Sequence, residues 1–171
     1  MTDPDPTFLP PGLDLGDEDV VESVEVTEEP PAPRTSGFDG VGTRREARER
    51  ALALLYEAEQ KGCAPLASIL DELPVPPEAY AGELVVGVSD HLAELDERLA
   101  GYSRNWPLER MPALDRALLR IGLYELIHTD VPVGACISEA VELAKRYSTD
   151  DSHRFVNGLL ARAATEVRPE A

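Results

Sequence analysis

The sequence is poor in aromatic residues, basic residues and cysteine. Aromatic side chains make up 5% of its 171 residues, and its two cysteines, Cys63 and Cys136, are far apart along the chain. We interpret them as reduced thiols packed among apolar side chains rather than as a disulfide. No stretch has the roughly 18 consecutive apolar residues of a membrane helix, and the first residues lack the basic and apolar segments of a signal peptide. We therefore expect a soluble, cytoplasmic protein.

Motifs that carry catalysis or hold cofactors are also missing. The sequence has no G-x-x-x-x-G-K-[ST] phosphate loop and no G-x-G-x-x-G turn. His91, His128 and His153 are scattered, and no cysteine or histidine pair has the spacing of zinc ligands. Residues 150–153 (DDSH) include acid, serine and histidine, but neighbours on a helix point in different directions, so we interpret them as a helix cap. We expect no enzyme, no metal and no cofactor.

Negative charge is in excess, and it is unevenly distributed. The formal net charge is −17, and residues 1–40 hold 11 acidic side chains against one arginine. This segment is rich in proline, aspartate, glutamate and glycine and has few apolar side chains, so ordering it would cost more entropy than burial returns. We predict that residues 1–42 form a disordered acidic tail.

The folded part is predicted to start with a helix at Thr43, which would form a capping box with Glu46. Small and apolar residues recur on one face of this helix: Ala47, Ala51, Leu54, Leu55 and Ala58. Arginines and a tyrosine occur on a second stripe: Arg45, Arg48, Leu52 and Tyr56. Arginines pair with phosphates and aromatic rings stack on unpaired bases, so this stripe suits single-stranded RNA. A solvated helix start is the alternative. Gly62 should end the helix.

Apolar residues from Ala81 to Tyr102 follow a 4-3 spacing that predicts one long helix with a continuous seam: Val85, Val88, Leu92, Leu95, Leu99 and Tyr102. We favour packing within the same domain, and a coiled-coil homodimer is the alternative. A shorter helix is predicted between Pro65 and Leu73.

The stretch from Leu114 to Ile127 is apolar nearly all round, which is typical of a helix buried at the centre of a bundle. Two further helices should follow, one opening at Pro132 and one between Ser148 and Asp151. No alternating strand pattern is present. The sequence therefore predicts an all-α fold of about seven helices.

Three strings in fixed order strongly resemble the NusB family of bacterial transcription antitermination factors: RREARERALALLYEAE, LDRALLRIGLYEL and VPVGACISEAVELAKRYSTDDSHRFVNGLL. The resemblance covers roughly residues 43–167. It implies an all-helical domain at 43–168 with two packed subdomains, about 43–102 and 108–168. It also implies that the protein binds the boxA element of RNA together with NusE, a small-subunit ribosomal protein. The pair would help assemble a termination-resistant RNA polymerase complex on ribosomal RNA operons.

The resemblance further implies which residues bind. The expected RNA contacts are Arg44, Arg45, Arg48, Tyr56, Tyr102, Arg154 and Phe155. Carboxylates of Glu109, Asp115 and Asp151 are expected to face the basic partner NusE. Glu46 stands where some members have a third consecutive arginine, which weakens the positive charge of the opening. The alternative function is a helical interaction module, or a homodimer through the Ala81–Tyr102 seam, without RNA affinity.

Overall fold

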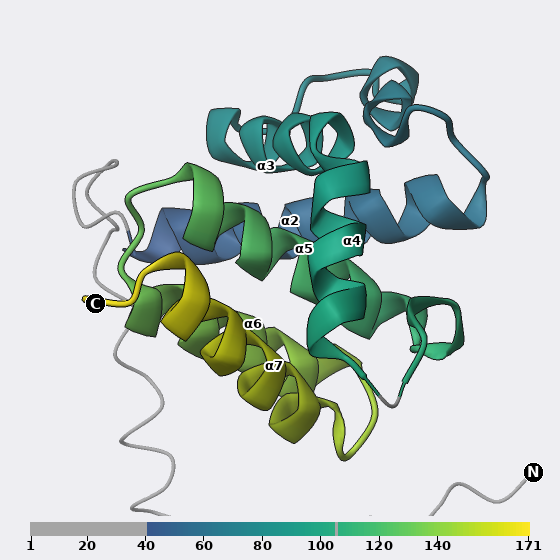
Figure 1. Ribbon diagram of the computed structural model, residues 1–171. Coiled ribbons are helices and arrows are strands. Elements are labelled where there is room, and N and C mark those ends of the chain that lie inside the picture. Colours follow the sequence, from purple (N-terminus) through teal and green to yellow (C-terminus); the bar gives the residue numbers. More distant parts are fainter. Residues whose placement is uncertain (1–40, 105) are drawn as a thin grey trace, which may run out of the picture. The chain divides into compact units, whose positions relative to one another are not determined.

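The computed structural model describes residues 41–104 and 106–171, and these form helices joined by short connections (Figure 1). In chain order the elements are α2 (Val41–Gln60), η1 (Leu66–Glu72), α3 (Ala79–Asp90), α4 (Leu92–Tyr102), η2 (Leu108–Arg110), α5 (Ala113–His128), α6 (Val133–Tyr147) and α7 (Ser152–Val167). The two η elements are 3-10 helices. The described part of the chain has no strand, so the all-α prediction is confirmed.

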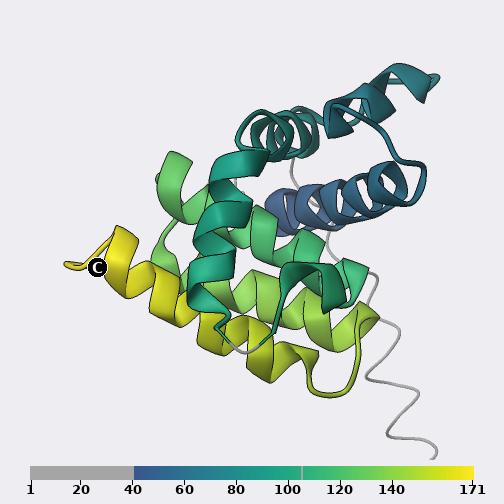
Figure 2. The same cartoon turned by 45° about the vertical axis from the view of Figure 1, so that its right-hand side comes forward.

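Helix α5 is the centre of the fold, as its apolar sequence predicted. Eleven of its 16 residues are buried, and it packs against α2, α3, α4, α6 and α7 (Figures 1 and 2). Gly122 allows a close approach of α7, because a Cβ there would lie 2.7 Å from Leu160 Cδ1. The described helices belong to one compact unit, and the division into subdomains 43–102 and 108–168 stays a prediction.

Helix α2 buries the predicted face. Its small and apolar residues Ala47, Ala51, Leu54, Leu55 and Ala58 are at most 3% exposed. Gly62 has a φ of 69°, and the Cys63 N–H donates to Ala58 O at 2.9 Å, which closes the helix as expected. The helix begins at Val41, two residues before the predicted start, so Thr43 lies inside it and is not its cap. The predicted tail, residues 1–42, is wrong for its last two residues, which belong to α2. Residues 1–40 lie outside the described residues, so the prediction for them stays untested.

The prediction of one helix from Ala81 to Tyr102 was wrong, because the chain turns at His91 between α3 and α4. The two helices run in clearly different directions in Figures 1 and 2. α3 packs on α2, η1 and α5, whereas α4 packs on α5 and α7, so the turn lets each half cover different neighbours. The seam residues Val85, Val88, Leu95 and Leu99 are fully buried inside the domain. The seam therefore cannot serve as the face of a coiled-coil dimer.

The last two helices begin close to where the sequence placed them. Pro132 precedes α6, and Asp151 precedes α7 without a side-chain cap hydrogen bond. The predicted side-chain cap is therefore wrong at Asp151. The Ser152 hydroxyl instead accepts a hydrogen bond at 3.2 Å from the Thr149 N–H, which lies in the turn before the helix. Among the described residues, no helix is long and apolar enough to cross a membrane.

Arg168, just after α7, holds the end of α5. Its guanidinium donates hydrogen bonds to the carbonyl oxygens of Leu126 at 2.8 Å, Val131 at 2.5 Å and Glu125 at 2.9 Å, and also to that of Thr129. Carbonyls at a helix end lack some of their partners within the helix, so these hydrogen bonds supplement them and attach the residue after α7 to the end of α5.

Both cysteines are free thiols, as predicted. Cys136 is buried, and this burial raises the pKa of its thiol to about 12. A thiol with such a pKa stays protonated at neutral pH and is a poor nucleophile.

Candidate nucleic-acid interface

Arg44 lies exposed at the start of α2. Its guanidinium carbon lies 5.2 Å from the centre of the Tyr80 ring, so the two side chains form a cation–π contact. Both residues line a hollow that also includes His128 and Asp130. Arg44 therefore keeps its charge at the surface, where a phosphate can reach it.

Arg45 is half exposed and already has an acidic partner on α6. Its Nε and Nη2 donate to the two carboxylate oxygens of Glu139, each at 2.9 Å. The Arg45 side chain is 49% exposed and that of Glu139 is 10% exposed. The hydrogen bond and charge of Arg45 lower the pKa of Glu139, and the same contacts raise the pKa of Arg45. A phosphate that binds Arg45 must compete with this carboxylate.

Arg48 is buried, which contradicts its expected place on an exposed RNA-binding stripe. It is 4% exposed, and its guanidinium donates three hydrogen bonds of 2.8–3.1 Å to Glu125 of α5. Burial alone would lower the pKa of Arg48, but the hydrogen bond and charge of Glu125 outweigh it and the pKa is raised. The hydroxyl of Tyr80 also donates to Glu125, at 2.5 Å. Arg48 thus joins α2 to α5 and is not available to a phosphate.

Tyr56 is 39% exposed and is not part of the core. With Tyr147 of α6 it lines a largely apolar hollow whose floor includes Leu52 and Leu114. The Tyr147 hydroxyl donates to Glu49, and Arg146 lies 3.6 Å from the same carboxylate. An exposed ring beside a second exposed ring suits stacking on an unpaired base.

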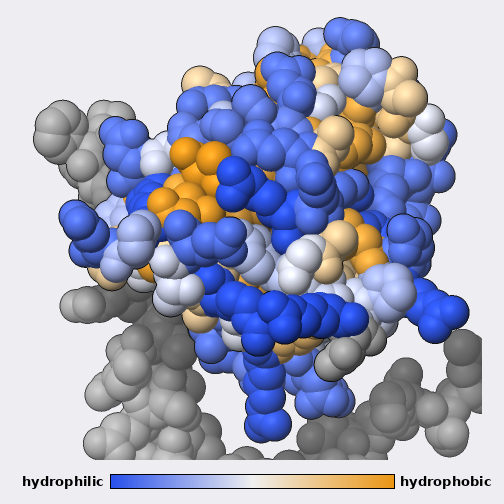
Figure 3. Space-filling model, in the orientation of Figure 1, coloured by the Kyte–Doolittle hydropathy of each residue, from blue (hydrophilic) through white to orange (hydrophobic). Residues whose placement is uncertain are grey.

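A second group of predicted residues meets between α4 and α7. Tyr102, Arg154 and Phe155 line one hollow together with Arg162. Arg154 is exposed, and Phe155 is half buried against Trp106 with ring centres 4.8 Å apart. Figure 3 shows that the face on which α4 and α7 lie is mostly hydrophilic, with several separate hydrophobic patches.

Arg162 is a residue that the sequence interpretation missed. Its Nη1 donates to the carbonyl oxygen of Tyr102 at 3.1 Å, and it adds a positive charge to the hollow. It follows Arg154 by eight residues, about two helical turns, so both lie on the same side of α7. Helical spacing alone could have identified it.

The three carboxylates expected to face a basic partner differ in exposure. Glu109 and Asp151 are exposed. Asp115 is 1% exposed, and it accepts hydrogen bonds from the hydroxyls of Ser152, at 2.9 Å, and Ser148. The structure therefore does not support Asp115 as a partner-binding residue. It connects the first turn of α5 to the turn between α6 and α7.

These features define a small helical protein with arginines and aromatic rings gathered at its surface, a combination found in proteins that bind single-stranded nucleic acid. Comparison with known proteins gives the family: residues 45–165 match the model of the NusB family. The chain belongs to this family, so the resemblance of its sequence motifs is confirmed.

Relatives share most of the domain. The transcription antitermination protein NusB of Kineococcus radiotolerans is 52% identical in an alignment of 128 positions that covers 72% of this chain and 94% of the relative. The solved structure of NusB from T. maritima superposes with a TM-score of 0.66 at 34% identity and covers 72% of this chain and 91% of that one. A solved complex of the antitermination factors NusB and NusE with double-stranded RNA matches with a TM-score of 0.60 at 27% identity, over 72% of this chain and 96% of that one.

Proposed function

We propose that this protein is a transcription antitermination factor that binds boxA-type single-stranded RNA together with NusE. In this proposal the pair helps assemble a termination-resistant RNA polymerase complex on ribosomal RNA operons. The support is membership of the NusB family, relatives named as antitermination proteins, and a similar protein whose solved structure contains NusE and double-stranded RNA. The preference for a single strand rests on the side chains of this chain. The protein acts in the cytoplasm as a binding factor and not as an enzyme.

The observation that carries the proposal is the gathering of Tyr102, Arg154 and Phe155 in one surface hollow. Arginine binds phosphate with two parallel hydrogen bonds, and aromatic rings stack on bases that are not already paired. The hollow combines both chemistries at one place, although α4 and α7 are far apart in the sequence. This arrangement favours an unpaired strand over a duplex.

Helix α2 supplies a further part of the RNA surface. Arg44 and Tyr56 are exposed, and Arg45 contributes once a phosphate replaces Glu139. Arg48 has a different role, because its buried pair with Glu125 fixes α2 against α5. It positions the surface residues and does not contact RNA.

The NusE surface is proposed to include the exposed carboxylates of Glu109 and Asp151. Negative groups at a surface steer a basic partner into contact and set the orientation of the complex. Asp115 supports this region from inside, because its hydrogen bonds to Ser148 and Ser152 hold the turn that carries Asp151.

The proposal is tested by titrating a boxA RNA against the full chain, alone and with NusE. A scrambled RNA and a boxA duplex serve as reference ligands. We expect the boxA single strand to bind more tightly than either, and NusE to tighten it further. Arg154→Ala should weaken binding and lower the slope of log affinity against log salt by about 0.7, the value for one phosphate contact on a single strand.

The control is Arg50→Ala, which removes the same charge from an exposed position on the opposite side of α2 from Arg45. It should change affinity much less. Equal binding of boxA and scrambled RNA, with or without NusE, would contradict the proposal. It would favour the alternative of an interaction module without RNA specificity.

A further inference from the structure

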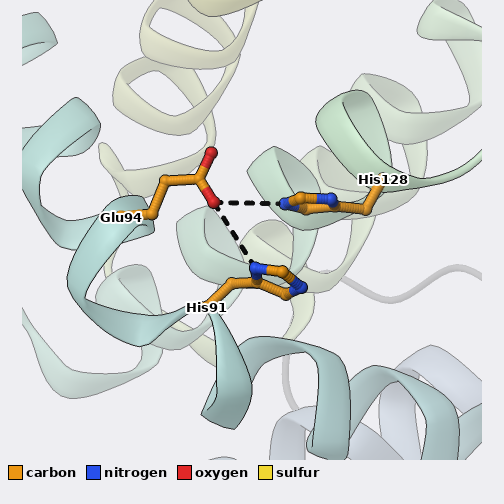
Figure 4. Close-up of side chains that lie close together, drawn as sticks. All are labelled: His91, Glu94 and His128. Carbon is orange, nitrogen blue, oxygen red and sulfur yellow. Dashed lines mark ion pairs between the residues drawn. The ribbon is translucent and has the colours of Figure 1, made fainter.

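Two histidines that look scattered in the sequence lie together in the fold, which corrects our interpretation of them. His91 lies at the junction of α3 and α4, and His128 is the last residue of α5. Their rings stack with centres 3.9 Å apart, and Glu94 of α4 faces both (Figure 4). Glu94 Oε2 lies 3.4 Å from His91 Nδ1 and 3.4 Å from His128 Nε2.

These distances are longer than good hydrogen bonds, whose N–O separation is about 2.9 Å. They match another geometry. Ligand atoms held about 2.05 Å from a tetrahedral zinc ion are separated from one another by about 3.3 Å. The three potential ligand atoms of His91, Glu94 and His128 all lie within 4.8 Å of one another. The distance between the two histidine nitrogens therefore has to shorten by about 1.5 Å at most to reach the tetrahedral value.

We propose that His91, Glu94 and His128 form a binding site for a divalent transition metal ion of the zinc class. Two imidazole nitrogens and one carboxylate oxygen are a known zinc ligand set, with a water molecule in the fourth position. Imidazole ligands favour zinc, copper and nickel over magnesium and calcium, which prefer oxygen ligands alone. The proposal is independent of RNA binding.

Residues around the cluster support its ligands. Arg98 Nε lies 3.4 Å from Glu94 Oε1, the oxygen that does not face the histidines, and forms an exposed ion pair with it. The Tyr124 ring is tilted against both imidazoles, with its centre 5.3 Å from that of His128 and 6.0 Å from that of His91. Tyr124 is itself held tightly, because a Cβ on Gly87 would lie 2.2 Å from its Cζ. Contacts of this kind restrict the orientation of the side chains that would bind the metal ion.

Metal binding requires one change in the cluster. A metal ion lies close to the plane of each imidazole that binds it, whereas the stacked rings are only 23° from parallel. One ring must therefore turn about its Cβ–Cγ bond. The side chain of His91 is 39% exposed and that of His128 is 26% exposed. His91 also lies at the junction of two helices, so its ring is the one with more room to turn. The bound ion would connect the α3–α4 junction to the end of α5.

The proposal is tested on the full chain with Zn²⁺ as the probe, by calorimetry in the presence of a competing chelator. We expect one Zn²⁺ ion per chain, and Co²⁺ in its place should give the strong visible absorption of a tetrahedral site. His128→Gln and Glu94→Gln should each weaken Zn²⁺ binding by at least about tenfold and remove the Co²⁺ bands. Circular dichroism checks that each variant keeps its helices.

The matched control is His153→Gln, which removes the third histidine from a partly exposed position on α7. It should keep both the stoichiometry and the Co²⁺ bands. The proposal is overturned if the wild-type chain binds no Zn²⁺. It is also overturned if the cluster variants bind Zn²⁺ as tightly as the control, since the acidic groups elsewhere would then account for the binding. RNA affinity is measured separately, so failure here leaves the proposed function untouched.

Discussion

Replacing Arg48 with alanine would leave the Glu125 carboxylate buried without its main partner. Glu125 is 1% exposed and receives three hydrogen bonds from Arg48 and one from Tyr80. The substitution removes three of these four bonds and the positive charge. The remaining hydroxyl cannot neutralise a carboxylate in a dry interior.

The expected decrease in the free energy of unfolding follows from known costs of buried ion pairs. Removing one partner of a buried ion pair costs about 3–5 kcal/mol, compared with the roughly 5–15 kcal/mol that stabilises a typical domain. Because Tyr80 keeps one bond to Glu125, we expect about 3 kcal/mol, near the lower end of that range. For a domain of this size that corresponds to a decrease in Tm of roughly 10 °C.

Thermal and urea unfolding measure this loss, and Arg50→Ala on the same helix is the control, with an expected change within about 0.5 kcal/mol. The double variant Arg48→Met with Glu125→Leu should recover much of the stability, because it leaves no unpaired buried charge. RNA affinity at a temperature where the variant is folded should keep its salt slope. Unchanged stability together with a lower salt slope would show that Arg48 contacts phosphate and would refute the reasoning.

Three further predictions concern the RNA surface. Glu139→Gln should release Arg45 and tighten RNA binding at low salt. It should also cost stability at neutral pH: the pKa of Glu139 is lowered in the folded state, so its stabilisation is present above the ordinary value of 4.5 and is lost as the pH falls through the folded pKa. Tyr56→Ala should cost about 1–3 kcal/mol of RNA binding with little loss of stability, and the reverse pattern would place Tyr56 in the core. Deleting residues 1–40, which carry a net charge of −10, should tighten RNA binding at low salt, with a gain that shrinks as salt rises; equal affinity at low salt would contradict it.

Local periodicity predicted most of the helices and the centre of the fold. The apolar run of α5 identified the most buried helix, and Arg116 and Arg120, four residues apart, share a face on which both pair with Glu59. Gly62 marked the end of α2, because glycine has no side chain and adopts a positive φ without steric strain. These features depend on residues close together in the sequence.

Features that depend on tertiary contacts could not be predicted from the sequence. The sequence around His91 has no proline, and its nearest glycine, Gly87, lies inside α3. The turn follows from what α3 and α4 pack against. Arg48 belongs to a stripe with Arg45, yet only the position of Glu125 on α5 decides that one is buried and the other exposed. The meeting of His91 and His128 likewise requires the fold.

Transcription through a terminator by the cognate RNA polymerase tests the central claim most directly. The template carries a ribosomal RNA leader with an intact or a mutated boxA, and the reaction contains NusE with the wild-type chain or a Phe155→Ala variant. We predict that the wild-type chain increases read-through only when boxA is intact, and that the variant loses most of this increase because it lacks the ring beside Arg154. Read-through that is the same with and without this protein on the intact template would contradict the account.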